Sequence, residues 1–333
     1  GSMVQAVQPA LEASSGKGCG LSFGLCYSPL FISLGSVIRD LLHPDLVLIG
    51  ESDDQAGSLL ASVYDTLCEN RPAVTRMNFV NAELTKLALN TYVTTKISFA
   101  NMLVELCERL PGADIDIVTR SLGHDSRVGG RYLTGALSYG GPCFPRDNVA
   151  MSYLARQLGC RAWLSESTAH TNRWHAAQVV ARIQHQLDAG MAVGVLGLAY
   201  KPDTDIVEES AGMTLAQGLV AAGFQVVVYD PLAMDNARSV LGAQVTYAPS
   251  VETCLAAVDA VVIANPAEEF QRLEARQFPV RAKPFIVFDC WRLLRATLER
   301  APHVRYVAVG VHHDEERVAT GAATCQVGEP LSG

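Results

Sequence analysis

The sequence predicts an α/β protein in three parts, and two patterns of apolar residues support that fold class. From residue 191 to about residue 310, stretches typical of strands alternate with stretches typical of helices. The better strands are continuously apolar, as in a buried parallel sheet with helices on both faces. Ahead of them, apolar residues recur every three or four positions over residues 81–110, which indicates one long helix. We therefore expect a central all-helical domain followed by a Rossmann-like parallel-sheet domain.

The first part of the chain has the pattern of the end of an α/β domain. Strands are expected at 21–26 and 46–49, with a short helix between them at 36–42 and helical spacing over 55–69. We interpret residues 4–75 as the remnant of an amino-terminal Rossmann-like domain. Gly1, Ser2 and Met3 are interpreted as an expression remnant.

The central part is expected to cover residues 76–190 and the last part residues 191–320. Asn81 with Glu83 is a start signal for the long helix. Further helices are expected at 113–122, 147–158 and 169–189. Strands of the last part are expected at 192–198, 225–229, 245–247, 260–264, 285–289 and 306–309. Residues 321–333 are expected to form a tail.

Composition excludes several classes of function. With 333 residues, 49% of them hydrophobic and 18% charged, the chain can form buried cores, and its net charge of −8 gives no basic surface for nucleic acid. No apolar run reaches the roughly 18 residues of a membrane span. The nine cysteines are scattered and never spaced as C-x-x-C, which argues against a disulfide framework and a zinc site. We expect a cytoplasmic protein that binds no metal, nucleic acid or membrane.

Two features of the last part could bind phosphate or ribose, and each has a simpler explanation. Residues 194–205 follow a strand and precede a helix, where backbone amides can hold phosphate and Lys201 adds charge; a tight glycine turn without a ligand explains them equally well. Asp230 ends the next strand, where a ribose-binding acid could sit, but an Asp-Pro turn is the commoner explanation. No G-x-G-x-x-G occurs in the chain, so residues that bind a dinucleotide remain unknown.

A glycine-rich loop presents Cys143 as a candidate nucleophile. The loop reads Tyr-Gly-Gly-Pro-Cys-Phe-Pro-Arg-Asp over residues 139–147. A neighbouring cation such as Arg146 favours the reactive thiolate, although a lone cysteine is more often inert packing. On the long helix, Lys86 and Asn90 lie one turn apart and can point at a common site. The alternative for that pair is a solvated lysine beside a polar partner.

Read together, these segments resemble the UDP-glucose/GDP-mannose dehydrogenases over nearly all of residues 5–310. The matching stretches are Ser28-Pro29 to Ile38 with His43-Pro44-Asp45, Asn81 to Asn90, Asp125 to Gly129, Tyr139 to Asp147, and Lys201 to Asp205 with Glu209-Ser210. The resemblance implies an amino-terminal NAD-binding domain, a central domain that forms a homodimer around one long helix, and a carboxy-terminal domain that binds a nucleoside diphosphate. It also implies oxidation of a nucleotide sugar, most suitably a UDP-sugar, to its uronate with two NAD, in polysaccharide or glycosylated-metabolite biosynthesis.

The same resemblance assigns roles to individual residues. Cys143 would form a thiohemiacetal that hydride loss converts to a thioester, Lys86 would stabilise the oxyanion, and Asn90 with Asp147 would position the hydrolytic water. Arg127 matches an arginine that reaches into the partner subunit's site. The remaining substrate-binding residues are expected to be Tyr132, Tyr139, Gly140, Gly141 and Lys201, with Arg292 as a candidate.

The sequence also departs from the family's pattern. Leu30 and Leu34 replace two glutamates, one of which is the family's general base for the thioester step. The D-G-R segment becomes Asp-Cys-Trp-Arg at 289–292, which removes a substrate-binding arginine unless Arg292 substitutes for it. The glycine-rich first half of the NAD domain is missing. Two hypotheses therefore stand: a nucleotide-sugar 6-dehydrogenase, or a catalytically degenerate nucleotide-sugar-binding or scaffold protein without redox activity.

Overall fold

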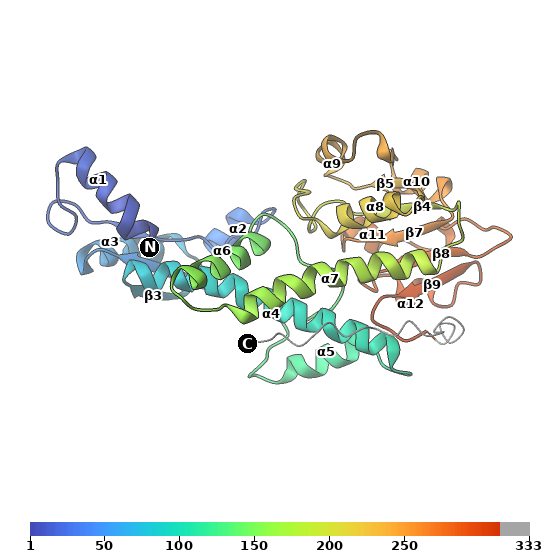
Figure 1. The fold of residues 1–333 in the computed structure, drawn as a ribbon, viewed down its shortest axis with the longest axis horizontal. Coiled ribbons are helices and arrows are strands. Elements are labelled where there is room, and N and C mark those ends of the chain that lie inside the picture. The colour runs from blue at the N-terminus through green and yellow to red at the C-terminus, as the bar shows by residue number, and fades with distance from the viewer. Residues whose placement is uncertain (314–333) are drawn as a thin grey trace.

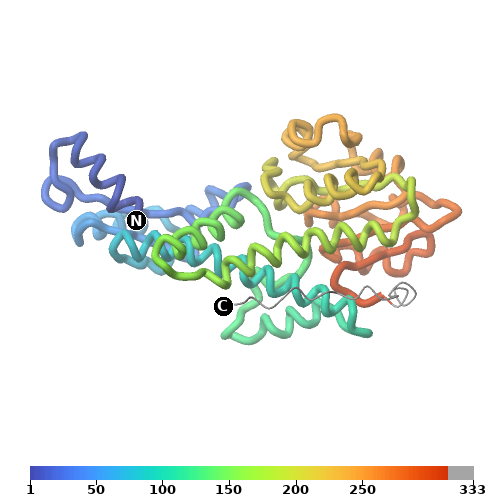
Figure 2. Tube along the Cα trace, viewed as in Figure 1, coloured from blue at the N-terminus to red at the C-terminus, as the bar shows by residue number. Residues whose placement is uncertain are grey.

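Two separate sheets lie at the ends of an elongated molecule, and long helices connect them (Figure 1). The computed structural model describes residues 1–313, so the predicted tail lies outside the described residues. The amino-terminal sheet has three strands in the order β1-β2-β3, and the carboxy-terminal sheet has six in the order β6-β5-β4-β7-β8-β9. Figure 2 shows helix α7 running from the helical middle of the molecule to the larger sheet.

The carboxy-terminal sheet confirms the Rossmann-like prediction. Every neighbouring pair of its strands is parallel, and apolar clusters cover both faces. The sheet order reverses direction between β4 and β7, the position where doubly wound folds bind ligands. Its strands are β4 (Ala192–Leu196), β5 (Gln225–Tyr229), β6 (Thr246–Tyr247), β7 (Ala260–Ile263), β8 (Phe285–Asp289) and β9 (Val304–Ala308). Its helices are α8 (Ala211–Ala221), α9 (Met234–Leu241), α10 (Val251–Ala257), α11 (Glu268–Gln271) and α12 (Arg295–Leu298).

The central part is helical, as predicted, but three of its helices begin earlier than expected. It contains α4 (Phe79–Arg109), α5 (Ile115–His124), α6 (Phe144–Gln157) and α7 (Trp163–His185). The residue that caps α4 is Asn78, whose side-chain oxygen accepts a hydrogen bond from the backbone N–H of Asn81 at 2.9 Å. Asn81 itself is inside the helix, so the predicted start was wrong by one turn.

The amino-terminal part corrects one further prediction. It contains a π-helical turn (Met3–Val7), α1 (Gln8–Ser15), β1 (Cys26–Tyr27), α2 (Val37–Leu42), β2 (Leu46–Glu51), α3 (Asp54–Leu67) and β3 (Ala73–Met77). The strand expected at 21–26 is absent except for its last residue, because Leu21 lies in a turn and is 93% exposed. Met3 is buried, and its N–H donates to Glu83 Oε1 at 2.8 Å. Met3 is therefore packed into the fold.

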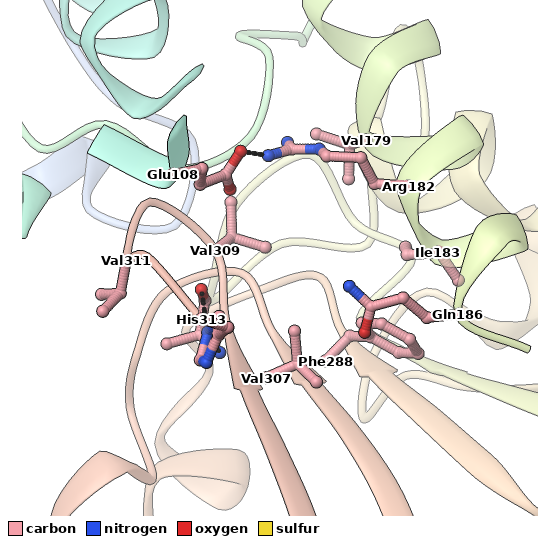
Figure 3. A pocket seen from close by; sticks show the side chains of 11 residues that line it. Glu108, Val179, Arg182, Ile183, Gln186, Phe288, Val307, Val309, Val311 and His313 are labelled. Atoms are coloured by element: carbon pink, nitrogen blue, oxygen red, sulfur yellow. Dashed lines mark hydrogen bonds and ion pairs between the residues drawn. The ribbon is translucent and has the colours of Figure 1, made fainter. Parts of the chain in front are cut away.

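Helix α7 connects the central helices to the larger sheet. Arg182 on α7 forms an ion pair with Glu108 at the end of α4, beside side chains of β8 and β9 (Figure 3). These residues enclose a cavity of about 30 Å³, which has room for a water molecule or two and none for a nucleotide. Among residues 1–313, no helix has the length and apolar character needed to cross a membrane.

Candidate active site

Four segments that are far apart in the sequence meet around Cys143. They are helix α4, the loop 139–143 with the start of α6, the segment 28–36 that precedes α2, and the loop 199–210 that follows β4. Three contacts link these segments one to the next. Lys86 of α4 contacts Asp147 of α6, and Gly140 of the cysteine loop contacts Glu209 of the loop after β4. Lys201 of that last loop contacts Ser33 of the segment 28–36. Each of the three structural parts therefore contributes to the site.

Asp147 is the centre of this cluster. Its side chain is 7% exposed, and it receives hydrogen bonds from Asn90 Nδ2 at 2.6 Å and Lys86 Nζ at 3.3 Å. Arg146 adds a third cationic or polar neighbour, with its Nε 3.5 Å from Asp147 Oδ1. A buried carboxylate needs such partners to remain in the interior. The predicted grouping of Lys86, Asn90 and Asp147 is thus present as a hydrogen-bonded unit.

Cys143 lies at the amino-terminal end of α6 with its thiol accessible. It is an exposed free cysteine, and its carbonyl accepts the first helical hydrogen bond, from the N–H of Asp147 at 2.9 Å. The guanidinium of Arg146 lies 3.6 Å from the sulfur. A helix amino terminus and a cation both stabilise a thiolate. The loop can therefore present a nucleophile beside the Asp147 cluster.

The glycines of the loop let it press against the loop that follows β4. A Cβ on Gly140 would lie 1.9 Å from the carbonyl oxygen of Glu209, and a Cβ on Gly141 would lie 2.5 Å from the ring of Tyr200. Gly141 also has φ +81°, a conformation that L side chains rarely adopt. The N–H of Gly141 donates to the carbonyl of Glu208 at 3.1 Å. Side chains at either glycine would push the nucleophile loop off this surface.

We expect Gly140→Ala to lower kcat/KM for a nucleotide sugar by about 10²-fold, since misplacement of a reacting group by about 1 Å costs that much. Steady-state kinetics of the folded variant would measure the change. Gly130→Ala is the matched control, because a Cβ there has its nearest neighbour at 3.8 Å. Equal kinetics for the two variants would contradict the prediction.

The segment 28–36 covers the other side of Lys86. The ring of Phe31 lies 5.7 Å from Lys86 Nζ, within reach of a cation–π contact. Ser33 Oγ accepts a hydrogen bond from Lys201 Nζ, and burial lowers the pKa of that lysine. A Cβ on Gly35 would lie 2.4 Å from the carbonyl oxygen of Asp203. Sequence reasoning had not assigned Phe31 or Ser33 to the site, although both lie in a segment of the family resemblance.

Aromatic rings complete the wall next to Cys143. The ring of Phe144 makes edge-on contacts with Tyr139, at a centroid distance of 6.2 Å, and with Tyr132, at 6.4 Å. The structure thus brings both predicted tyrosines to the nucleophile loop. Arg127 lies elsewhere: its side chain is 87% exposed and pairs with Asp125 at 2.7 Å.

Two other candidates have structural partners of their own. Arg292, with a side chain 1% exposed, donates to Asp116 at 2.9 Å and to the carbonyls of Gly135 and Val309 at 2.8 and 2.9 Å. Its hydrogen bonds thus tie the end of β8 to the central part. Asp230 accepts hydrogen bonds from four backbone N–H groups, those of residues 198, 199, 232 and 233. Asp230 thus caps its own turn and also ties that turn to the loop after β4.

The junction of β2 and α3 in the amino-terminal sheet lacks the glycine turn that holds a pyrophosphate. Dinucleotide sites need a glycine turn between a strand and a helix, where backbone amides face the pyrophosphate. Here the junction of β2 and α3 is occupied by acids: Asp53 caps α3 through the N–H of Ala56 at 2.9 Å, and Glu51 pairs with Arg76 at 2.7 Å. A Cβ on Gly57 would lie 1.6 Å from Glu51 Oε2, so the glycine makes room for a carboxylate. We attribute no hydride-transfer step to these residues.

Comparison with protein families gives matches along most of the chain. Residues 80–174 match the central domain of the UDP-glucose/GDP-mannose dehydrogenase family. Residues 194–296 match the UDP binding domain of that family, and residues 1–68 match its NAD binding domain.

Individual relatives agree. UDP-glucose 6-dehydrogenase AglM of Haloferax volcanii is 34% identical over 294 residues, which cover 87% of this chain and 67% of that protein. UDP-glucose 6-dehydrogenase of Rickettsia typhi is 31% identical, with 88% and 68% covered. The structure of a UDP-glucose dehydrogenase from Pyrobaculum islandicum superimposes with a TM-score of 0.78 at 33% identity, over 92% of this chain and 67% of that one. The chain thus spans about two thirds of the length of these relatives.

Proposed function

Because the chain belongs to the UDP-glucose/GDP-mannose dehydrogenase family, we propose that it is a nucleotide-sugar 6-dehydrogenase that acts through Cys143. The observation that supports this most directly is the accessible thiol at the start of α6 beside the Asp147–Asn90–Lys86 cluster. The substrate class is a UDP-sugar, because residues 194–296 match the family's UDP binding domain. The product is the corresponding uronate.

In the proposed reaction the Cys143 thiolate adds to the C6 aldehyde of the sugar and forms a thiohemiacetal. Lys86 stabilises the negative oxygen that this addition creates, and the Asp147–Asn90 pair orients the water that later attacks the thioester. The ammonium of Lys86 lies between Asp147 and the ring of Phe31, so its position is fixed before the substrate arrives.

The oxidation also needs a hydride acceptor, which in this family is NAD. Oxidation from the alcohol to the thioester would need two NAD, one for each hydride that the C6 carbon loses. The described residues of the NAD-matching segment lack the glycine turn and present carboxylates there, so this step is not assigned to them.

The experiment that tests the proposal is NADH formation by the purified chain with NAD and a panel of UDP-, GDP- and dTDP-sugars. Turnover would support the proposal, and the best substrate would identify the activity. Binding of the same sugars, measured by calorimetry without NAD, separates recognition from oxidation. A folded chain that binds a UDP-sugar but never forms NADH would be a nucleotide-sugar-binding protein, and the proposed oxidation would be wrong.

We also propose that the chain forms a homodimer through α4. Large apolar side chains lie along one face of this helix and are 43–65% exposed in the single chain. At 100° per residue they occupy a stripe opposite Lys86 and Asn90. An exposed stripe of this length is typical of a protein interface. It consists of Val80, Leu84, Tyr92, Phe99, Met102 and Leu106.

We expect Phe99→Glu to convert the dimer into a monomer, since it places a charge in the centre of the stripe where a second apolar face would cover it. Sedimentation analysis would show the mass halved. Leu21→Glu is the control, because Leu21 is 93% exposed and lies in a turn far along the chain from α4. A wild-type chain that sediments as a monomer would contradict this part of the proposal.

The eight described cysteines are free thiols, including the two exposed ones, Cys143 and Cys160. Free accessible thiols persist in a reducing compartment. This supports the expectation that the protein acts in the cytoplasm.

A further inference from the structure

The segment that leads into the nucleophile loop depends on side chains for its backbone hydrogen bonds. Residues 136–139 are not part of a strand, so no sheet neighbour satisfies their N–H and C=O groups. Buried groups of this kind must find other partners. Helices α4 and α7, which lie on either side of the segment, supply them.

Two asparagine side chains supply partners for these backbone groups, each using both its carbonyl oxygen and its amide nitrogen. On α7, Asn172 accepts from the N–H of Tyr139 with Oδ1 and donates to the carbonyl of the same residue with Nδ2, both at 2.9 Å. On α4, Asn101 accepts from the N–H of Ala136 and donates to the carbonyl of Leu137, both at 3.0 Å. Each carboxamide thus pairs with the backbone as a neighbouring strand would. Asn172 does so at the residue directly before Gly140.

The position of Asn172 links it to the start of α6. Tyr139, which it holds, packs edge-on against Phe144, and Phe144 directly follows Cys143 as the first residue of the helix. Ser138 adds a second tie from the same segment, because its Oγ donates to the carbonyl of Asn172 at 2.7 Å. A shift of Tyr139 would therefore reach the first turn of α6.

The segment at Tyr139 borders a cavity on the side of Asn172. A cavity of about 450 Å³ lies between α7 and α8, and Ser138, Tyr139 and Asn172 are part of its wall. Without the carboxamide, the backbone at Tyr139 would lose both partners and have space to move into.

We infer that Asn172 is a positioning residue. It fixes the backbone of the nucleophile loop at Tyr139, so that Cys143 stays at the amino-terminal end of α6 beside Arg146. The inference rests on the proposed function for its link to turnover. Its link to the thiol does not depend on turnover, because a displaced first turn weakens the helix-end and guanidinium stabilisation of the thiolate.

The test compares Asn172→Ala and Asn172→Asp with Gln184→Ala. Aspartate keeps an acceptor for the Tyr139 N–H but cannot donate to its carbonyl, so both Asn172 variants lose the paired contact. Gln184 is a matched control on the same helix and cavity wall; its carboxamide donates only to the carbonyl of Gly218, at 3.4 Å. Circular dichroism and thermal melting would establish that all three variants are folded.

The first readout is the rate at which iodoacetamide alkylates Cys143, with Cys160 as an internal reference. We expect at least a threefold fall at Cys143 in both Asn172 variants and no change at Cys160. The second readout is kcat with NAD and the best UDP-sugar, for which we expect a fall of about 10- to 100-fold. Folded Asn172 variants that match Gln184→Ala within twofold in alkylation of Cys143 would overturn the inference. A wild-type chain without turnover would refute the proposed function, while the alkylation rates would still decide the role of Asn172.

Discussion

Cys143→Ala is expected to lower kcat for nucleotide-sugar oxidation by about 10³-fold or more, because in the proposed route this thiol carries the acyl intermediate. The side chain is accessible at the start of α6, with Arg146 3.6 Å from the sulfur. NADH formation with the best sugar of the panel would measure the loss. Affinity for the same sugar should stay within about tenfold, since a thiol adds little to ground-state binding.

Cys160→Ala is the matched control for this experiment. Cys160 is the other exposed cysteine among residues 1–313, and its sulfur contacts the carbonyl of Leu158 and no group of the site. The Cys160→Ala variant should keep full activity. Turnover that survives Cys143→Ala would assign the oxidation to another group, and the thiohemiacetal route would be abandoned.

Leu30→Glu is expected to raise the steady-state release of uronate by about 10²-fold. The family resemblance places a glutamate at the position of Leu30, and an apolar side chain cannot accept a proton from the hydrolytic water. A positioned general base contributes about 10²- to 10⁴-fold to such a step. Leu30 is 46% exposed and precedes Phe31, whose ring lies 5.7 Å from Lys86 Nζ. A carboxylate at this position therefore has room beside the site.

The wild-type chain should accordingly accumulate the thioester on Cys143. Intact-mass analysis after incubation with NAD and the sugar would show a uronoyl adduct that hydroxylamine removes. Leu30→Gln is the control, since it has the size and polarity of glutamate without its basicity. Rapid uronate release by the wild-type chain, or equal rates for the glutamate and glutamine variants, would show that the base lies elsewhere.

Much of this arrangement was predictable because its signals are local. The 3.6-residue period of α4 places Lys86 and Asn90 on one face, and the continuous apolar strands after residue 191 indicate a parallel sheet. The helix that carries Asp147 was also expected, although it begins at Phe144 and not at residue 147, which brings Cys143 to its start. Short-range periodicity and spacing are sufficient for such features.

Other features depend on residues far apart in the sequence. Asn172 and Tyr139 are separated by 33 positions, and an isolated asparagine in a helix has no pattern that reveals its partner. The strand β1 is two residues long and exists only because β2 lies beside it. Arg292 was a candidate ligand by alignment with an arginine of the family, yet its guanidinium is buried against Asp116 and backbone carbonyls. Each of these outcomes is decided by tertiary contacts.

The buried position of Arg292 affects how the protein unfolds. To separate the larger sheet from the central helices, the chain would have to pull this guanidinium away from Asp116 and the carbonyls of Gly135 and Val309. Neighbouring Arg295 would lose Asp114, at the start of the same helix α5. Removing the partners of a buried charged group raises the free energy of the partly unfolded state. We therefore expect the central helices and the larger sheet to melt as one cooperative unit, although they match two separate family domains.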